Sequence, residues 1–265
     1  MVINHDIHLH THLSRCGKED AYVNAYVAQA AELGLTLLGF TDHMWDDAFP
    51  GWPDFYDGQN FAHIDSLKEE IAQTEHPGVK IFHGAEVEYD PARRDLAITP
   101  ENVEKLDYII VPNSHTHMVM PKEYYADKRK HIDFMLQAFM GVMDSPLARK
   151  ITAMAHPFCA VDCPYGYEEM LGMISDSTYE KCFGAAADNG IAIEINLSKF
   201  RDYSIAQIQQ SNNIRLFQIA KRTGCKFSFG SDAHTMRHQQ QFKNFYVVAG
   251  ILNLTEDDLC DFVRG

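Results

Sequence analysis

The stretch HDIHLHTH occupies residues 5–12, and a second motif near the other end of the chain, GSDAH, ends at His234. On a β-strand, residues i and i+2 point to the same side. His8 and His10 can therefore offer two imidazoles to one metal ion. In the second motif, Asp232 and His234 can offer a carboxylate and an imidazole in the same way.

Further polar side chains stand between these two motifs, each after a run of apolar, strand-like residues. They are His43, Glu86, His115 and His156. This arrangement is typical of a barrel that builds a multi-metal site from the ends of its strands. We therefore predict an α/β fold with a metal site at the C-terminal ends of the strands.

Short apolar runs alternate with longer amphipathic stretches along the chain, as in parallel α/β folds. The predicted strands are Val2–Ile7, Thr36–Phe40, Val79–His83, Tyr108–Val111, Ile151–Ala155, Ala192–Ile195 and Lys226–Phe229. The predicted helices are Ala21–Leu33, Phe61–Thr74, Lys122–Met143, Tyr167–Asn189, Ser204–Arg222 and Glu256–Val263. A barrel is favoured over a doubly wound sheet, because an open sheet usually concentrates its ligands at one switch point.

The least regular stretch, residues 44–60, is rich in aromatic side chains and follows the second predicted strand. A barrel would place a substrate loop at this point. The stretch is expected to be either a lid or a hydrophobic cover for the barrel rim.

The composition limits the classes to which the protein can belong. A length of 265 residues with 46% hydrophobic and 23% charged residues fits a single globular domain over residues 1–265. The net charge of 23 − 37 = −14 argues against nucleic acid as the main partner. We see no signal peptide and no membrane-spanning run, and the six cysteines form no C-x-x-C pair. We expect reduced thiols and a cytoplasmic location.

The predicted ligand set combines at least five imidazoles with at least two carboxylates. It suits zinc, manganese or iron better than magnesium or calcium, which prefer oxygen ligands. A carboxylate such as Glu86 can bridge two cations, and such a pair activates water and holds phosphate oxygens. We expect two to three divalent transition-metal ions.

Two neighbouring residues have other expected roles. His117 competes with His115 for one ligand position, and His115 is favoured because it comes first after its strand. Asp42 directly precedes His43 and could orient a ligand from behind.

Taken together and in order, these motifs resemble the polymerase and histidinol phosphatase (PHP) superfamily of metal-dependent phosphoesterases. The matching segments are residues 6–11, 39–43, 84–86, 107–115, 155–157, 194–196 and 230–234. They span nearly the whole chain. The resemblance implies a distorted (β/α)7 TIM-like barrel, which agrees with the strand count, and a site with three metal ions.

The resemblance also implies how the ligands are shared among the ions. The first ion would be held by His8, His10, Glu86 and Asp232. Its neighbour would be held by Glu86, His115 and His156. The third would be held by His43, His234 and a residue soon after the first motif.

The chain departs from the family pattern in two places. Where family members often carry histidine or aspartate for the third ion, Cys16 aligns best by count, with Glu19 or Asp20 as alternatives. One extra residue precedes His115, which leaves the choice between His115 and His117 open.

Residues after the sixth predicted strand are candidates for contact with substrate. Asn196 is expected to stand behind the metal ligands. The family often has a basic residue after this position that meets the substrate phosphate, and Lys199 and Arg201 lie there. The guanidinium of Arg201 is suited to a bidentate hydrogen bond with phosphate. The alternative is that both are solvated loop charges.

We therefore expect a phosphomonoesterase in which a metal-activated hydroxide attacks the phosphorus of a small phosphorylated metabolite. The resemblance points to L-histidinol phosphate, and the alternative within the family is a nucleotide or other small-metabolite phosphatase or phosphodiesterase. A barrel amidohydrolase would need a lysine at the strand end where Glu86 or His115 stands. A non-catalytic metal-binding module is the remaining alternative, and the oligomeric state is left open.

Overall fold

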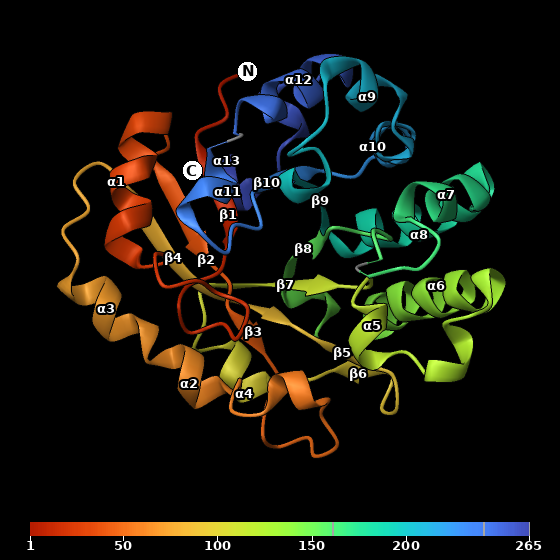
Figure 1. Ribbon diagram of the computed structural model, residues 1–265, viewed down its shortest axis with the longest axis horizontal. Coiled ribbons are helices and arrows are strands. Elements are labelled where there is room, and N and C mark those ends of the chain that lie inside the picture. Colours follow the sequence, from red (N-terminus) through yellow and green to blue (C-terminus); the bar gives the residue numbers. More distant parts are fainter. Residues whose placement is uncertain (161, 241, 265) are drawn as a thin grey trace.

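The computed structural model describes residues 1–160, 162–240 and 242–264, and Figure 1 shows its strands near the centre with helices around them. In this part of the chain, the main sheet runs in the order β1 (His5–Leu9), β2 (Leu37–Phe40), β4 (Lys80–Val87), β7 (Tyr108–Pro112), β8 (Ile151–Ala155), β9 (Ala192–Asn196) and β10 (Phe227–Gly230). Each of these strands is parallel to its neighbour in that order.

The first and last strands meet and nearly close the sheet into a barrel. The backbone N–H of Asp232 donates to the carbonyl of His8 at 2.9 Å, and that of His10 donates to the carbonyl of Ala233 at 3.0 Å. Leu9 and Ala233 also form a parallel bridge. The predicted seven-stranded α/β barrel is therefore confirmed, and its closure brings the two motifs from opposite ends of the chain together.

Five strands extend further than predicted, β1 and β4 by more than one residue. β1 runs to Leu9 and so includes His8, and β4 runs to Val87 instead of ending at His83. The extension of β4 is stabilised on both sides, because β3 (His43–Met44) and β7 both pair with it. Glu86 therefore lies within a strand and not after one. A short antiparallel hairpin of β5 (Tyr89–Asp90) and β6 (Asp95–Leu96) follows.

The helices cover the outside of the barrel (Figure 1). They are α1 (Val23–Leu33), α2 (Phe61–Asp65), α3 (Leu67–Gln73), α4 (Pro100–Val103), α5 (Thr116–Val119), α6 (Lys128–Asp144), α7 (Tyr167–Met173), α8 (Asp176–Asn189), α9 (Ile205–Gln210), α10 (Asn212–Arg222), α11 (Met236–Gln239), α12 (Lys243–Ile251) and α13 (Asp261–Arg264). Within the described residues, none of them combines the length and apolar character needed to cross a bilayer.

Several predicted helices are divided or shortened by polar caps. Ser175 accepts from the N–H of Thr178 and starts α8, and Ser211 accepts from the N–H of Asn213 and starts α10. Asp127 caps α6 in the same way, so that helix begins after the predicted start. Such side chains satisfy N–H groups at the start of a helix, and apolar periodicity does not reveal them.

The C-terminal region was predicted least well. α12 was not predicted, and the helix predicted over Glu256–Val263 is a 3-10 turn (Glu256–Asp258) followed by α13. The α12 sequence KNFYVVAGI has no strong helix periodicity. It is helical because Phe245 and Val248 are buried against the rest of the core.

The aromatic stretch over residues 44–60 packs against the barrel rim. Trp45 and Tyr56 are buried together with Ala97, and Phe49 and Phe55 pack partly buried against them. This packing favours the hydrophobic cover of the two predicted roles.

Candidate metal centre

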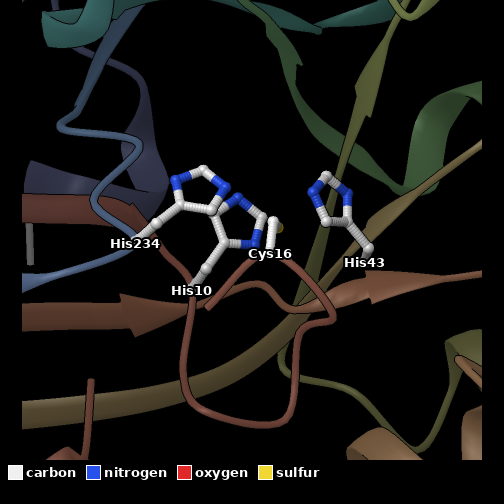
Figure 2. Close-up of side chains that lie close together, drawn as sticks. All are labelled: His10, Cys16, His43 and His234. Atoms are coloured by element: carbon white, nitrogen blue, oxygen red, sulfur yellow. The ribbon is translucent and has the colours of Figure 1, made fainter. Parts of the chain in front are cut away.

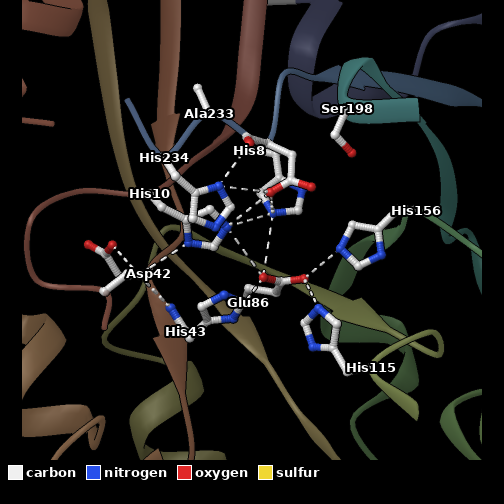
Figure 3. A network of polar contacts seen from close by, with 12 residues as sticks. His8, His10, Asp42, His43, Glu86, His115, His156, Ser198, Ala233 and His234 are labelled. Carbon is white, nitrogen blue, oxygen red and sulfur yellow. Dashed lines mark hydrogen bonds and ion pairs between the residues drawn. The ribbon is translucent and has the colours of Figure 1, made fainter. Parts of the chain in front are cut away.

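The eight principal predicted ligands gather at the carboxyl ends of the strands, and Figure 3 shows seven of them labelled around one point. They come from β1, β3 and β4 and from the segments that follow β1, β7, β8 and β10: His8, His10, His43, Glu86, His115, His156, Asp232 and His234. All are buried except Asp232 and His234, whose side chains are 13% and 22% exposed.

The Glu86 carboxylate lies at the centre of the group, and its oxygens face different partners. Oε2 lies 3.5 Å from Nε2 of His8 and 3.5 Å from Nε2 of His10. Nδ1 of His43 lies 2.9 Å from the same oxygen.

The other oxygen of Glu86 faces the opposite wall of the site. Oε1 lies 3.0 Å from Nε2 of His156 and 3.6 Å from Nε2 of His115. A carboxylate whose two oxygens face separate sets of imidazoles can bridge two cations.

Asp232 completes the set around the first histidine pair. Its Oδ1 lies 3.8 Å from Nε2 of His8 and 3.5 Å from Nε2 of His10, and the two Nε2 atoms are 3.1 Å apart. Ligands at about 2.0–2.1 Å from a tetrahedral ion lie roughly 3.3 Å from one another. The spacing of these atoms therefore fits one ion.

Four of the imidazoles have a side chain as hydrogen-bond partner at Nδ1, the nitrogen that faces away from the centre. The pairs are His8 with Glu194 at 2.7 Å, His10 with Ser14 at 3.2 Å, His115 with Glu88 at 2.9 Å and His156 with Ser114 at 2.6 Å. An Nδ1–H that donates outward leaves the lone pair of Nε2 facing the centre. Partners of this kind orient imidazoles for metal binding.

Two buried polar atoms at the centre, Oε2 of Glu86 and Nδ1 of His43, lie 2.9 Å apart, but neither makes a well-aligned hydrogen bond among the described residues. An unpaired buried carboxylate oxygen is costly, and lone pairs that point at one another repel. A divalent cation between them would relieve both costs, so the donor set fits a metal ion.

The electrostatics of the site favour the cation-binding forms of Glu86, Asp232 and His10. Burial disfavours the charged form of Glu86, but neighbouring imidazoles, His43 foremost, hold its pKa well below its usual range. Burial opposes the charge of Asp232 too, but the surrounding imidazoles, His8 foremost, together outweigh it, so the pKa of Asp232 is also well below its usual range. Burial lowers the pKa of His10 strongly. Ionised carboxylates and a neutral imidazole are the ligating forms.

Neighbouring carboxylates and Cys16, acting against burial, raise the pKa of His8, His43 and His234. These imidazoles would therefore release a proton when an ion binds.

Cys16 lies beside three imidazoles, as Figure 2 shows, and forms a further donor group with them. One donor atom each from Cys16, His10, His43 and His234 lies within 4.8 Å of the others. Burial would raise the pKa of the thiol, but His43 and His234 lower it to about 6.

The two carboxylates named as alternatives to Cys16 lie elsewhere. Glu19 is exposed. Asp20 accepts hydrogen bonds from Oγ1 of Thr235 at 2.7 Å and from the N–H of Met236 at 3.3 Å. Neither residue belongs to a donor group in the described part of the chain.

A cavity of about 270 Å³ opens beside the donors, and Lys199, Arg201 and His117 are among the residues that line it. Arg201 donates to the carbonyl of Ser231 at 3.3 Å, while its buried Nε has no partner among the described residues. Within those residues neither Lys199 nor Arg201 forms an ion pair. His117 belongs to no donor group there, whereas His115 shares one with Glu86, so the geometry favours His115.

Asp42 supports the loop that carries the partner of His10. It accepts hydrogen bonds from the N–H and Oγ1 of Thr11, at 2.7 and 2.6 Å, and from Oγ of Ser14 at 2.6 Å. Asp42 thus lies behind the donors, on the side away from the centre of the group.

Asn196 also stands behind the donors. Its amide donates to Glu194 at 2.9 Å and lies 3.5 Å from Oδ2 of Asp232.

Glu194 and Glu88, the acceptors at Nδ1 of His8 and of His115, are site residues that the sequence motifs did not predict. Glu194 is a carboxylate within the apolar strand β9, and charged side chains are rarely buried without a partner. Glu88 follows Glu86 at spacing two. These two signals could have identified both residues.

The backbone around these residues is strained or tightly packed. His156 and Asp232 have positive φ angles of 28° and 53°, which are costly for residues other than glycine. At Gly230, a Cβ would lie 2.0 Å from Oε1 of Glu194 and 2.5 Å from Cβ of His8. The glycine therefore allows Glu194 to reach His8.

We predict that Glu194→Gln weakens metal binding about tenfold, because losing a partner behind a ligating histidine typically costs about 10–100-fold. The amide keeps the shape but accepts less strongly from His8. Titration against a chromophoric chelator would measure the change, with Glu101→Gln as control, since Glu101 is 81% exposed. Unchanged affinity would contradict a role for Glu194 in orienting His8.

Comparisons with known proteins agree with this geometry. The PHP domain family matches residues 6–208. A protein of Syntrophotalea carbinolica named "Probable phosphatase" is 26% identical over 240 residues, which cover 89% of this chain and 83% of that protein. A "Probable phosphatase" of Clostridium novyi is 26% identical over 86% of this chain and 78% of its own length.

A solved structure has a similar fold. It is histidinol phosphate phosphatase from Lactococcus lactis, complexed with zinc, L-histidinol and phosphate. It aligns with a TM-score of 0.64 at 17% identity and covers 95% of this chain and 94% of that one. Because the family match extends over most of the chain, this protein belongs to the PHP domain family.

Proposed function

We propose that the chain is a metal-dependent phosphomonoesterase that acts on a small phosphorylated metabolite in the cytoplasm. Membership of the PHP family makes it a hydrolase of the phosphoesterase class. The observation that carries the proposal is Glu86, whose two oxygens each face a separate group of imidazoles. Such a bridge is typical of two-metal phosphoesterase sites.

The residues around Glu86 would hold two ions. One position is formed by His8, His10 and Asp232 with one oxygen of Glu86, and the other by His115 and His156 with the second oxygen. When bound, zinc, manganese or iron at these positions would supply Lewis-acid activation of water and neutralise charge on phosphate oxygens.

The cavity beside the donors would hold the ester. Arg201 would donate to phosphate oxygens, because its buried Nε lacks a partner and its guanidinium can donate in a fork. Lys199 lines the same cavity and would add positive charge. Phe55 and Met118 give the cavity an apolar wall that would contact the carbon skeleton of the leaving group and exclude water from it.

L-histidinol phosphate is the first substrate to test, since the Lactococcus lactis enzyme of similar fold is a histidinol phosphate phosphatase. The alternatives are a nucleotide or another small phosphate ester.

A panel of phosphate esters, assayed with protein loaded separately with zinc, manganese or iron, would test the proposed function. We expect release of inorganic phosphate from at least one monoester, its loss after treatment with a chelator, and its return when the metal is restored. Protein that carries metal but hydrolyses no phosphate ester would overturn the proposal. Turnover that persists after complete metal removal would overturn it too.

A further inference from the structure

We infer that Cys16 supplies a thiolate to a third metal position, together with His43 and His234, and that this donor makes the position selective for zinc. The inference rests on the proposed metal-dependent function, which needs only the two positions around Glu86. It concerns a residue at which the chain departs from its family's pattern.

The donor atoms come from three separate parts of the chain and meet at one point (Figure 2). Cys16 lies in the loop after β1, His43 in β3 and His234 after β10. Their donor atoms, with one of His10, lie within 4.8 Å of one another. His10 borders both this group and the group of His8 and Asp232, so the third position would adjoin the first.

The loop is held in the conformation that presents Cys16. The side chain of Gln59 accepts a hydrogen bond from the backbone N–H of Arg15 at 2.7 Å and donates one to the backbone carbonyl of Leu13 at 3.1 Å. A Cβ at Gly17 would lie 2.0 Å from the carbonyl oxygen of Thr11, so the turn requires glycine there. Contacts on both sides of Cys16 therefore fix the position of its thiol.

The same loop is tied to the segment that carries His234. The N–H of Lys18 donates to the carbonyl of His234 at 2.9 Å. This backbone hydrogen bond therefore holds the segments that carry Cys16 and His234 side by side.

The setting of Cys16 differs from that of the other cysteines. Among the described residues it is the one cysteine in a donor group with imidazoles, and it lines the cavity. Cys159 is buried and donates to the side chain of Asn213, and Cys225 is buried and donates to the carbonyl of Phe183. The thiols of Cys159 and Cys225 contact an amide side chain and a backbone carbonyl, whereas the thiol of Cys16 lies next to imidazoles that can bind the same ion.

A sulfur donor changes which ion the position prefers. Thiolate and imidazole together select zinc, whereas manganese prefers carboxylate and water ligands. The two positions around Glu86 have carboxylate donors and would accept a wider range of ions. The third position would therefore be filled by zinc even where manganese fills the other two.

Metal content and spectroscopy would test this independently of catalysis. Full-length protein loaded with zinc should lose about one ion per chain in Cys16→Ser, while Cys163→Ser, a half-buried cysteine outside the donor groups, should keep all its ions. Protein loaded with cobalt(II) should show near-ultraviolet thiolate-to-cobalt charge transfer that Cys16→Ser abolishes and Cys163→Ser retains. Equal zinc content in Cys16→Ser and the unmodified chain, or charge transfer that survives Cys16→Ser, would overturn the inference.

A measurement on the unmodified chain covers the case in which Cys16→Ser does not fold. Alkylation of Cys16 by iodoacetamide, followed by peptide mass spectrometry, should be at least about tenfold slower with zinc than with manganese, because a coordinated thiolate is a poor nucleophile. Equal rates with the two metals would overturn the inference.

The two proposals can fail separately. If zinc protects Cys16 but the protein hydrolyses no phosphate ester, only the proposed function is contradicted. If the protein is an active phosphatase but zinc does not protect Cys16, only this inference is contradicted.

Discussion

Replacing Glu86 by glutamine is expected to lower kcat/KM for a phosphate ester by roughly three orders of magnitude or more, while the chain stays folded. Each oxygen of Glu86 faces a separate group of imidazoles, so the amide would weaken both metal positions at once. Loss of one electrostatic donor in an active site already costs about 10²–10³ in kcat. Steady-state assays with metal analysis would measure the effect, and circular dichroism would confirm folding.

A double variant tests whether the donors act as one unit. His8→Ala and Asp232→Ala should each be nearly inactive, because both residues share the first position with Glu86. The combination of His8→Ala with Glu86→Gln should lose little more than either change alone. A combined loss equal to the product of the two single losses would show that these residues serve separate sites. Glu101→Gln, on the exposed face of α4, is the matched control.

Arg201→Ala is expected to raise KM for a phosphate ester roughly tenfold or more, because a hydrogen bond to a charged group contributes about 1.5–3 kcal/mol. Arg201 lines the cavity but belongs to no donor group in the described residues, so bound metal should not change. Initial-rate kinetics and elemental analysis of the same preparation would measure both quantities.

Conservative and neighbouring variants sharpen this test. Arg201→Lys keeps the charge but loses the planar fork, so it should recover only part of the affinity. Lys199→Met, in the same cavity, should have the smaller effect, since an ammonium cannot make the paired contact with phosphate that a planar guanidinium makes. Lower metal content in Arg201→Ala, with KM unchanged, would mean that Arg201 serves the metals and not the phosphate.

The barrel and the general location of the site could be predicted from local patterns. Alternating apolar runs and amphipathic stretches predict parallel strands with crossover helices. Because parallel strands all end at the same rim, polar residues that follow them must gather there. This reasoning found His8, His10, His43, His156 and the other principal donors, which the structure brings together.

The helix boundaries and the supporting residues could not be predicted in this way. Ser175 and Ser211 divide two predicted helices through caps that leave the apolar periodicity intact. The sequence signals of Glu194 and Glu88 do not say which imidazoles they orient, and this became clear only when the structure placed them beside Nδ1 of His8 and of His115.

The sequence by itself determined which donors exist, their order along the chain and the rim at which they collect, because these depend on residue type and on the repeat of two along a strand. The tertiary structure alone decided among the alternatives that spacing left open. It brought Cys16 to the donors and kept Asp20 away, and it placed His115 next to Glu86 instead of His117. These outcomes depend on loop conformation and on closure of the barrel. Both are determined by contacts between residues far apart in the chain, which a local sequence pattern cannot reveal.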